Sequence, residues 1–210
     1  MGPADAIILA SDLRVLIESV APAVGGDDDL LPGGVSMGAI SLRLSGDLLS
    51  AQASDRYIVL RNAVRAPSRA ATTAAAFSIP AVEVKPLVAA LRKEGHVLLF
   101  VAEGEVSIVS TQEDRPPLGS FRADEAATVL WKSLSHVQYA QGEQMNGQER
   151  SVIPIARLSA VLAAAKKVSP KGSLVESLPG YLRSPVRFVH TRSEHWEAIV
   201  MPDAGPISAA

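Results

Sequence analysis

One short apolar pattern occurs three times in this chain of 210 residues, at nearly equal intervals. In each copy, four apolar residues are spaced i, i+3, i+4 and i+7, which puts their side chains on one face of a helix. An isoleucine stands five positions before the first of them. The copies are Leu13, Leu16, Ile17 and Val20 after Ile8; Val84, Leu87, Val88 and Leu91 after Ile79; and Leu158, Val161, Leu162 and Ala165 after Ile153. They indicate a repeated strand–helix unit, and therefore a protein built by internal duplication.

The second and third copies agree beyond the apolar stripe. Ile79-Pro80 corresponds to Ile153-Pro154, and the basic pair Arg92-Lys93 corresponds to Lys166-Lys167. The alternative is chance similarity, because helices rich in Leu, Val and Ala often share this spacing.

Runs of strand-forming residues separated by small turn residues follow the first two helices and the last one. The pattern predicts antiparallel hairpins and meanders. The predicted strands are residues 36–44, 48–53, 56–64, 97–102, 106–110, 186–189 and 196–200. A helix is expected from about Val84, because Pro86 is tolerated in a first turn, and another over residues 155–168. The fold class is therefore α+β, with repeated strand–helix–antiparallel-strand units.

Residues 116–150 interrupt the repeat. Arg115-Pro116-Pro117 is typical of a linker, so we place a boundary between a two-unit domain, residues 1–121, and a shortened domain, residues 122–210. Asp124 is a candidate N-cap for a further helix. The inner face of that helix would consist of Ala126, Val129, Leu130, Ser133 and Leu134. The alternative is a strand over residues 127–131.

The composition limits the classes of protein to which the chain can belong. Apolar residues make up 48% and charged residues 20%, a balance that is typical of a soluble globular protein. There is no cysteine, so thiol catalysis and Cys-based zinc sites are excluded, and a reducing cytoplasm is the expected compartment. No apolar run approaches the roughly 20 residues that span a bilayer, and the N-terminus does not resemble a signal peptide. The net charge of −2 means that contact with nucleic acid would need a local basic patch.

Three passages resemble the DNA sliding clamp family, most closely the bacterial DNA polymerase III beta clamp. Residues 40–55 (ISLRLSGDLLSAQASD) resemble the hairpin that ends in the family's Thr-Asp-Gly-His-Arg-Leu signature. Residues 77–91 (FSIPAVEVKPLVAAL) resemble its Ile-Pro-led helix, and residues 199–202 (IVMP) resemble its C-terminal strand, which ends Val-Met-Pro. The likeness covers residues 5–121 and 150–202, and it implies a clamp-like fold.

The resemblance also implies a pocket for short linear peptides of a polymerase or another client. Two segments would form it: Ser54, Asp55, Arg56, Tyr57 and Val59 in the place of the signature, and Ile199, Val200, Met201 and Pro202 as the other wall. The signature is altered here, since Arg56 replaces glycine and Ile58 replaces arginine. A cleft of this apolar character with a methionine suits varied Leu and Phe side chains. The alternative is that Val200 and Met201 are only core residues of an edge strand.

Clamps hold duplex DNA without reading its sequence, through basic side chains on the helices that line the ring. Carried over, the DNA-facing candidates are Arg14, Arg92, Lys93, Lys132, Arg157, Lys166, Lys167 and Lys171. The alternative is a solvated helix surface with cations placed favourably near helix C-termini. Because family rings contain six domains, a two-domain chain would close as a homotrimer, with a clamp loader as a further possible partner.

A catalytic role has weaker support. His190, Glu194, His195 and Glu197 lie close together in the sequence, and His190, His195 and Glu197 are possible metal ligands. Polar residues two apart are also typical of the wet face of a strand. We therefore expect a binding protein without a cofactor or a metal. The leading function is a polymerase processivity factor. The alternatives are a clamp-derived adaptor that binds peptides without forming a ring, and a small metal-dependent enzyme.

Overall fold

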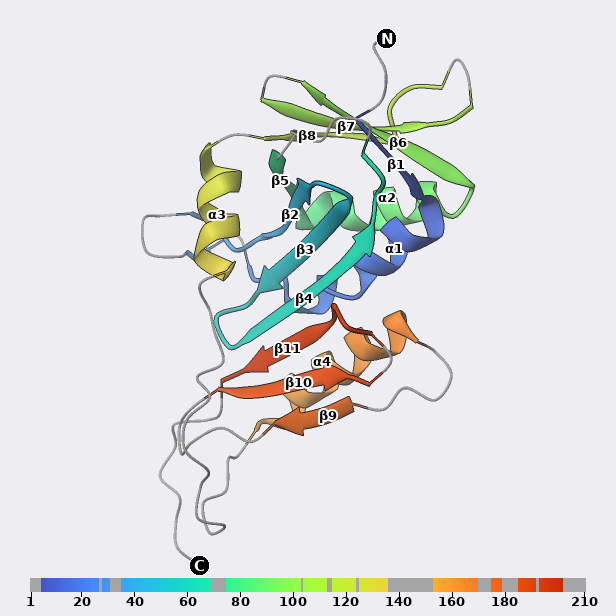
Figure 1. Cartoon of the computed structure of the whole chain (residues 1–210). Helices are drawn as coiled ribbons and strands as arrows, with labels where there is room; N and C mark the ends of the chain where they lie inside the picture. The colour runs from blue at the N-terminus through green and yellow to red at the C-terminus, as the bar shows by residue number, and fades with distance from the viewer. Residues whose placement is uncertain are drawn as a thin grey trace, which may run out of the picture.

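The structure is a computed structural model that describes residues 5–26, 28–30, 35–68, 75–102, 104–112, 115–123, 125–135, 153–169, 175–178, 185–191 and 193–201. Its elements in chain order (Figure 1) are β1 (Ala6–Leu9), α1 (Ala10–Glu18), the 3-10 helix η1 (Ala21–Ala23), β2 (Ala39–Ser45), β3 (Leu48–Ser54), β4 (Ile58–Arg65), β5 (Ala75–Pro80), α2 (Ala81–Leu91), β6 (His96–Ala102), β7 (Glu105–Ser110), β8 (Gly119–Arg122), α3 (Glu125–Ser135), α4 (Ile155–Val168), β9 (Val175–Leu178), β10 (Val186–His190) and β11 (Glu197–Val200).

The first two repeats exchange strands in a reciprocal way. One sheet has the order β1-β6-β7-β8, and the other begins β5-β2-β3-β4. The strand before each helix therefore pairs with the first strand after the other helix: β1 with β6, and β5 with β2. Helices α1 and α2 pack against each other. This symmetry confirms that the units repeat, and it confirms the α+β class.

The third repeat extends the second sheet. Strand β11 pairs antiparallel with β4, with Ile199 opposite Val59 and Val200 opposite Ile58, and the order continues through β10 to β9 at the edge. One seven-stranded sheet thus contains strands from both sides of the domain boundary predicted at 121/122. The boundary itself stays a prediction. Among the described helices, none is long and apolar enough to cross a membrane.

The helices lie on both faces of the seven-stranded sheet. Leu49, Ala51 and Ala53 of β3 point into the main core together with residues of α1, α2 and α4. Gln52 points the other way, since strand side chains alternate between faces, and its Nε2 donates to the carbonyl of Trp131 in α3 at 2.7 Å. Helix α3 therefore covers the face opposite α1, α2 and α4 (Figure 1).

Several local expectations need correction. Residues 127–131 are helical, so the strand alternative is wrong, and the buried residues of α3 are Ala127, Leu130 and Leu134. Strand β8 begins at Gly119, within residues 116–150, the segment expected to interrupt the repeat. Helix α2 begins at Ala81, before the predicted start. Its Pro86 is exposed, so water can replace the hydrogen bond that the missing N–H cannot make. Helix α4 spans the predicted residues 155–168.

Candidate functional site

A tight turn joins β3 to β4 at the place of the predicted peptide pocket. The Asp55 side chain accepts hydrogen bonds from the backbone N–H groups of Tyr57 (3.0 Å) and Ile58 (2.8 Å), and Ser54 Oγ accepts one from the N–H of Arg56 (3.2 Å). Arg56 has φ of 74°, a left-handed conformation that glycine adopts most easily. A residue other than glycine therefore occupies the left-handed position of this turn.

The two predicted walls lie side by side. Strand β11 pairs with β4, and beyond the last strand pair the N–H of Met201 donates to the carbonyl of Tyr57 at 2.7 Å. Two segments separated by about 140 residues in the sequence thus meet at one surface. Pro202 is outside the described residues.

Only part of the predicted set is accessible. Tyr57 is 51% and Met201 39% exposed, whereas Val59, Ile199 and Val200 are buried at 6%, 2% and 0%. The three buried side chains hold the strands together, so they support the surface from below. The expectation that Val59, Ile199 and Val200 contact a peptide directly is therefore corrected: they lie beneath the exposed surface.

Arg157 belongs to this surface. Its guanidinium carbon lies 4.1 Å from the centroid of the Tyr57 ring, a cation–π arrangement, and its Nη1 donates to the carbonyl of Met201 at 2.7 Å. The sequence placed Arg157 among the DNA-facing cations. Nothing in its spacing on α4 indicated Tyr57, because that contact depends on the pairing of β11 with β4.

Arg56, one of the predicted pocket residues, has an internal partner. Its Nε lies 3.1 Å from Asp29 Oδ1, and Asp29 Oδ2 accepts from the N–H of Gly26 at 2.9 Å. The N–H of Gly25 lies 3.1 Å from the carbonyl of Ser54. The loop before β2 thus holds the turn between β3 and β4 in place.

We expect the left-handed conformation at Arg56 to show in stability. Arg56→Val should lower the free energy of unfolding by about 1–2 kcal/mol, because a β-branched residue is strained there. Arg56→Gly should cost less than Arg56→Val, since glycine relieves the strain while losing the half-exposed ion pair with Asp29. Urea unfolding of the two variants checks the order, and equal losses would contradict the assignment of strain.

The other predicted DNA-facing cations differ in their surroundings. Arg92 and Lys167 approach the same carboxylate oxygen, Glu18 Oε1, at 3.9 and 3.4 Å, and their side chains stay 62% and 49% exposed. Arg14 is partly buried on α1, and Lys93 and Lys166 are exposed. Lys132 lies on α3 and therefore on the opposite face of the sheet, while Lys171 is outside the described residues.

A groove of about 590 Å³ separates the end of α1 from α2. Val24, Val84 and Val88 line it together with Glu18, Arg92 and Lys167. Lys85 also lines it. The sequence pattern did not indicate this cation, because Lys85 lies outside the basic pairs at the helix C-termini. The helical face thus carries basic side chains around one acidic group.

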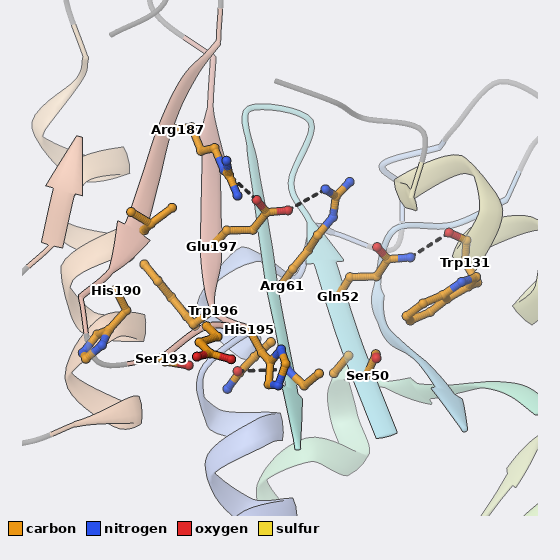
Figure 2. Close-up of a pocket in the computed structure, with 15 residues that line it drawn as sticks. Ser50, Gln52, Arg61, Trp131, Arg187, His190, Ser193, His195, Trp196 and Glu197 are labelled. Atoms are coloured by element: carbon orange, nitrogen blue, oxygen red, sulfur yellow. Dashed lines mark hydrogen bonds and ion pairs between the residues drawn. The ribbon is translucent and has the colours of Figure 1, made fainter. Parts of the chain in front are cut away.

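A second cavity, of about 600 Å³, opens on the α3 side of the sheet (Figure 2). Glu197 lies at its wall between two arginines: Oε1 accepts from Arg61 Nη1 at 2.7 Å and Oε2 from Arg187 Nε at 2.8 Å. Arg61 also donates to the carbonyl of Leu134. These contacts join β4, β10, β11 and α3.

The predicted metal ligands do not converge. Figure 2 shows His190 and His195 apart from Glu197, whose two oxygens already bind arginines. His190 is buried edge-on to Trp196 with a centroid distance of 6.2 Å. Among the described residues, no group of three or more His, Asp or Glu side chains is placed to hold a metal ion. The geometry therefore gives no support to the metal-dependent enzyme.

Comparison with known proteins identifies the fold. No protein-family model and no curated protein matches the sequence. Solved structures do match: the DNA polymerase sliding clamp from Pseudomonas aeruginosa has a TM-score of 0.66 at 14% identity, over 97% of this chain and 68% of that one. The sliding clamp from Bartonella birtlesii gives 0.64 at 14% over 99% and 67%. The DNA polymerase III beta subunit from Thermotoga maritima gives 0.59 at 13% over 98% and 67%. This chain therefore has the fold of the bacterial DNA polymerase III beta sliding clamps and spans about two thirds of their length.

Proposed function

We propose that the protein is a DNA sliding clamp that encircles duplex DNA as part of a homo-oligomer and binds client peptides, such as those of a polymerase. The observation that carries the proposal is the placement of α1, α2 and α4, the helices of three clamp-like units, on one face of the strands, with basic side chains exposed there. Such a surface attracts phosphates without reading bases, so binding is independent of sequence and falls with salt. A clamp loader remains a further prediction.

The experiment that tests DNA binding compares the two faces of the molecule. Arg92→Ala combined with Lys167→Ala should weaken binding to a labelled DNA duplex by roughly tenfold or more near 0.1 M salt, because two phosphate-facing charges are lost and Glu18 is left unpaired. Lys132→Glu lowers the net charge by the same two units on the opposite face, and it should leave binding nearly unchanged. Fluorescence anisotropy over a salt series measures both.

If the double alanine change and Lys132→Glu weakened DNA binding equally, only the net charge of the protein would matter for binding. The face that carries α1, α2 and α4 would then not be the DNA-binding surface. Both sites are exposed, so we expect the variants to keep their stability within about 0.5 kcal/mol. Circular dichroism checks this.

The peptide surface is proposed to consist of Tyr57, Met201 and Arg157, held in place by the Ser54–Ile58 turn and strand β11. A half-exposed aromatic ring and a methionine offer an adaptable apolar contact, and Arg157 favours an acidic residue beside the anchor. Met201→Ala should weaken binding of a peptide with an aliphatic or aromatic anchor by about 1–3 kcal/mol.

The change Arg157→Ala distinguishes between peptide binding and DNA binding as the role of this side chain. We expect it to weaken peptide binding and to leave DNA binding unchanged, because Arg157 contacts Tyr57 and Met201. Isothermal titration with the peptide, together with anisotropy with the duplex, checks both. Loss of DNA binding with intact peptide binding would return Arg157 to the DNA-facing set.

An adaptor that binds peptides without encircling DNA is the second candidate. The described residues hold three helices on the inner face, one fewer than two complete domains require, and this observation favours it. Retention on a DNA duplex with both ends blocked distinguishes the candidates, since only a closed ring stays bound at high salt.

A further inference from the structure

One carboxylate lies within the basic helical face that we propose to bind DNA. Glu18 is the last residue of α1, and its Oε1 lies 3.9 Å from Arg92 Nη2 and 3.4 Å from Lys167 Nζ. Arg92 directly follows α2, and Lys167 belongs to the last turn of α4. The helices of all three repeated units thus bring one acidic and two basic side chains to the same place.

These ion pairs contribute little to the packing of the helices. The side chains of Arg92 and Lys167 are more than half and about half exposed, and exposed ion pairs add little to stability. The separation of 3.9 Å at Arg92 is also longer than a hydrogen bond. Instead, the three helices pack through buried apolar side chains such as Leu16, Leu91 and Val161. Stability therefore does not explain a carboxylate at this position.

Both cations keep most of their hydrogen-bonding capacity for a ligand. A guanidinium has five N–H donors and an ammonium has three, whereas one carboxylate oxygen, Glu18 Oε1, faces both of them here. The exposed parts of Arg92 and Lys167 can therefore contact phosphate oxygens while the pairs with Glu18 are kept. A phosphate would then compete with Glu18 for the same two cations.

The charge of Glu18 also acts on the phosphate itself. Screening by salt extends over about 10 Å at 0.1 M. Since Glu18 Oε1 lies 3.9 and 3.4 Å from the two cations, a phosphate in contact with either cation is within the range of the carboxylate. The phosphate is attracted by the cation and repelled by Glu18. One negative charge thus offsets half of the positive charge that Arg92 and Lys167 present together.

We propose that Glu18 weakens the binding of phosphates by Arg92 and Lys167, so that these two cations attract duplex DNA without binding any one phosphate tightly. This role rests on the proposed function, because it concerns the same DNA-binding face. Glu18 acts through its charge on the two cations and on the approaching backbone. A protein that moves along DNA must release each phosphate as it passes, and a carboxylate between two cations favours that release.

The change Glu18→Gln tests this role, because it removes the charge and nearly preserves the size of the side chain. We expect it to tighten binding to a labelled DNA duplex about three- to tenfold near 0.1 M salt, since each phosphate contact contributes roughly that much. The slope of log Kd against log salt should become steeper by about one, because the released cations neutralise phosphates more completely. Fluorescence anisotropy over a salt series measures both quantities.

Glu125→Gln is the matched control. Glu125 is an exposed carboxylate on α3, which lies on the opposite face of the sheet. The change raises the net charge by the same one unit, and screening should keep its effect on DNA binding within about twofold. Glu18→Ala is a second variant at the site itself, and it should tighten binding in the same direction as Glu18→Gln. Thermal unfolding followed by circular dichroism checks that all three variants are folded.

Four results would overturn the proposal. Unchanged affinity and salt slope in Glu18→Gln would mean that the carboxylate has no influence on DNA. Weaker binding would mean that Glu18 holds Arg92 and Lys167 in place for phosphates. An equal gain from Glu125→Gln would mean that only net charge matters. These three results leave the proposed function intact, since the wild-type protein binds DNA in each. A wild-type protein that does not bind the duplex even at low salt would remove the proposed function together with this role.

Discussion

Replacing Trp196 by alanine should lower the free energy of unfolding by about 3–5 kcal/mol, the range for deleting a large buried aromatic side chain. Trp196 is 1% exposed and belongs to the main core. It directly precedes β11, the strand that pairs with β4 and leads to Met201. The cavity left by the ring would therefore weaken the hairpin that carries one wall of the proposed peptide surface.

Trp196→Phe is the matched control. It keeps an aromatic ring in the core, and it should cost about 1–2 kcal/mol because less volume is lost. The indole N–H of Trp196 has no hydrogen-bond partner in the part of the chain that the structure describes, so the phenylalanine variant loses no bond. Urea unfolding followed by circular dichroism measures both variants. Similar losses for Ala and Phe would show that the volume of the lost ring does not determine the destabilisation.

Glu197→Ala should destabilise the protein by roughly 2–3 kcal/mol. The carboxylate is 19% exposed and bonds two arginines, Arg61 and Arg187, whose side chains are 20% and 34% exposed. Removing one partner of a buried ion pair costs about 3–5 kcal/mol, because a charge is left without compensation. Partial exposure reduces that figure here. The loss should be larger than the cost of Arg187→Ala, since Arg61 would still hold Glu197 in the latter variant.

Glu194→Ala serves as the control for this site. Glu194 is an exposed carboxylate at the same cavity, so its removal should change stability by no more than about 0.5 kcal/mol. A double-mutant cycle of Glu197→Ala with Arg61→Ala measures the coupling between β11 and β4. A coupling near zero would mean that strand hydrogen bonds alone hold this junction.

The repeated pattern determined much of the fold. Its three stripes predicted three amphipathic helices, and α4 has the predicted bounds because Pro154 precedes it and Ser169-Pro170 follows it in the sequence. The hairpins of the first unit follow from local turn residues such as Ser45, Gly46 and Asp47. The resemblance of residues 40–55 and 199–202 to clamp passages suggested that distant segments meet, and the pairing of β11 with β4 brings them together. Their role in peptide binding stays a prediction.

Tertiary structure alone decided what covers each apolar face. Periodicity shows which side of a helix is apolar, but it does not say which element packs there. For this reason the sequence did not show that α3, which carries Lys132, packs on the face of the sheet opposite α1, α2 and α4. For the same reason it could not distinguish the buried Ile17 from the exposed Leu162, which occupy the same place in their repeats. Arg157 met Tyr57 only because strand pairing over about 140 residues placed them together, and such long-range pairing leaves no local signal in the sequence.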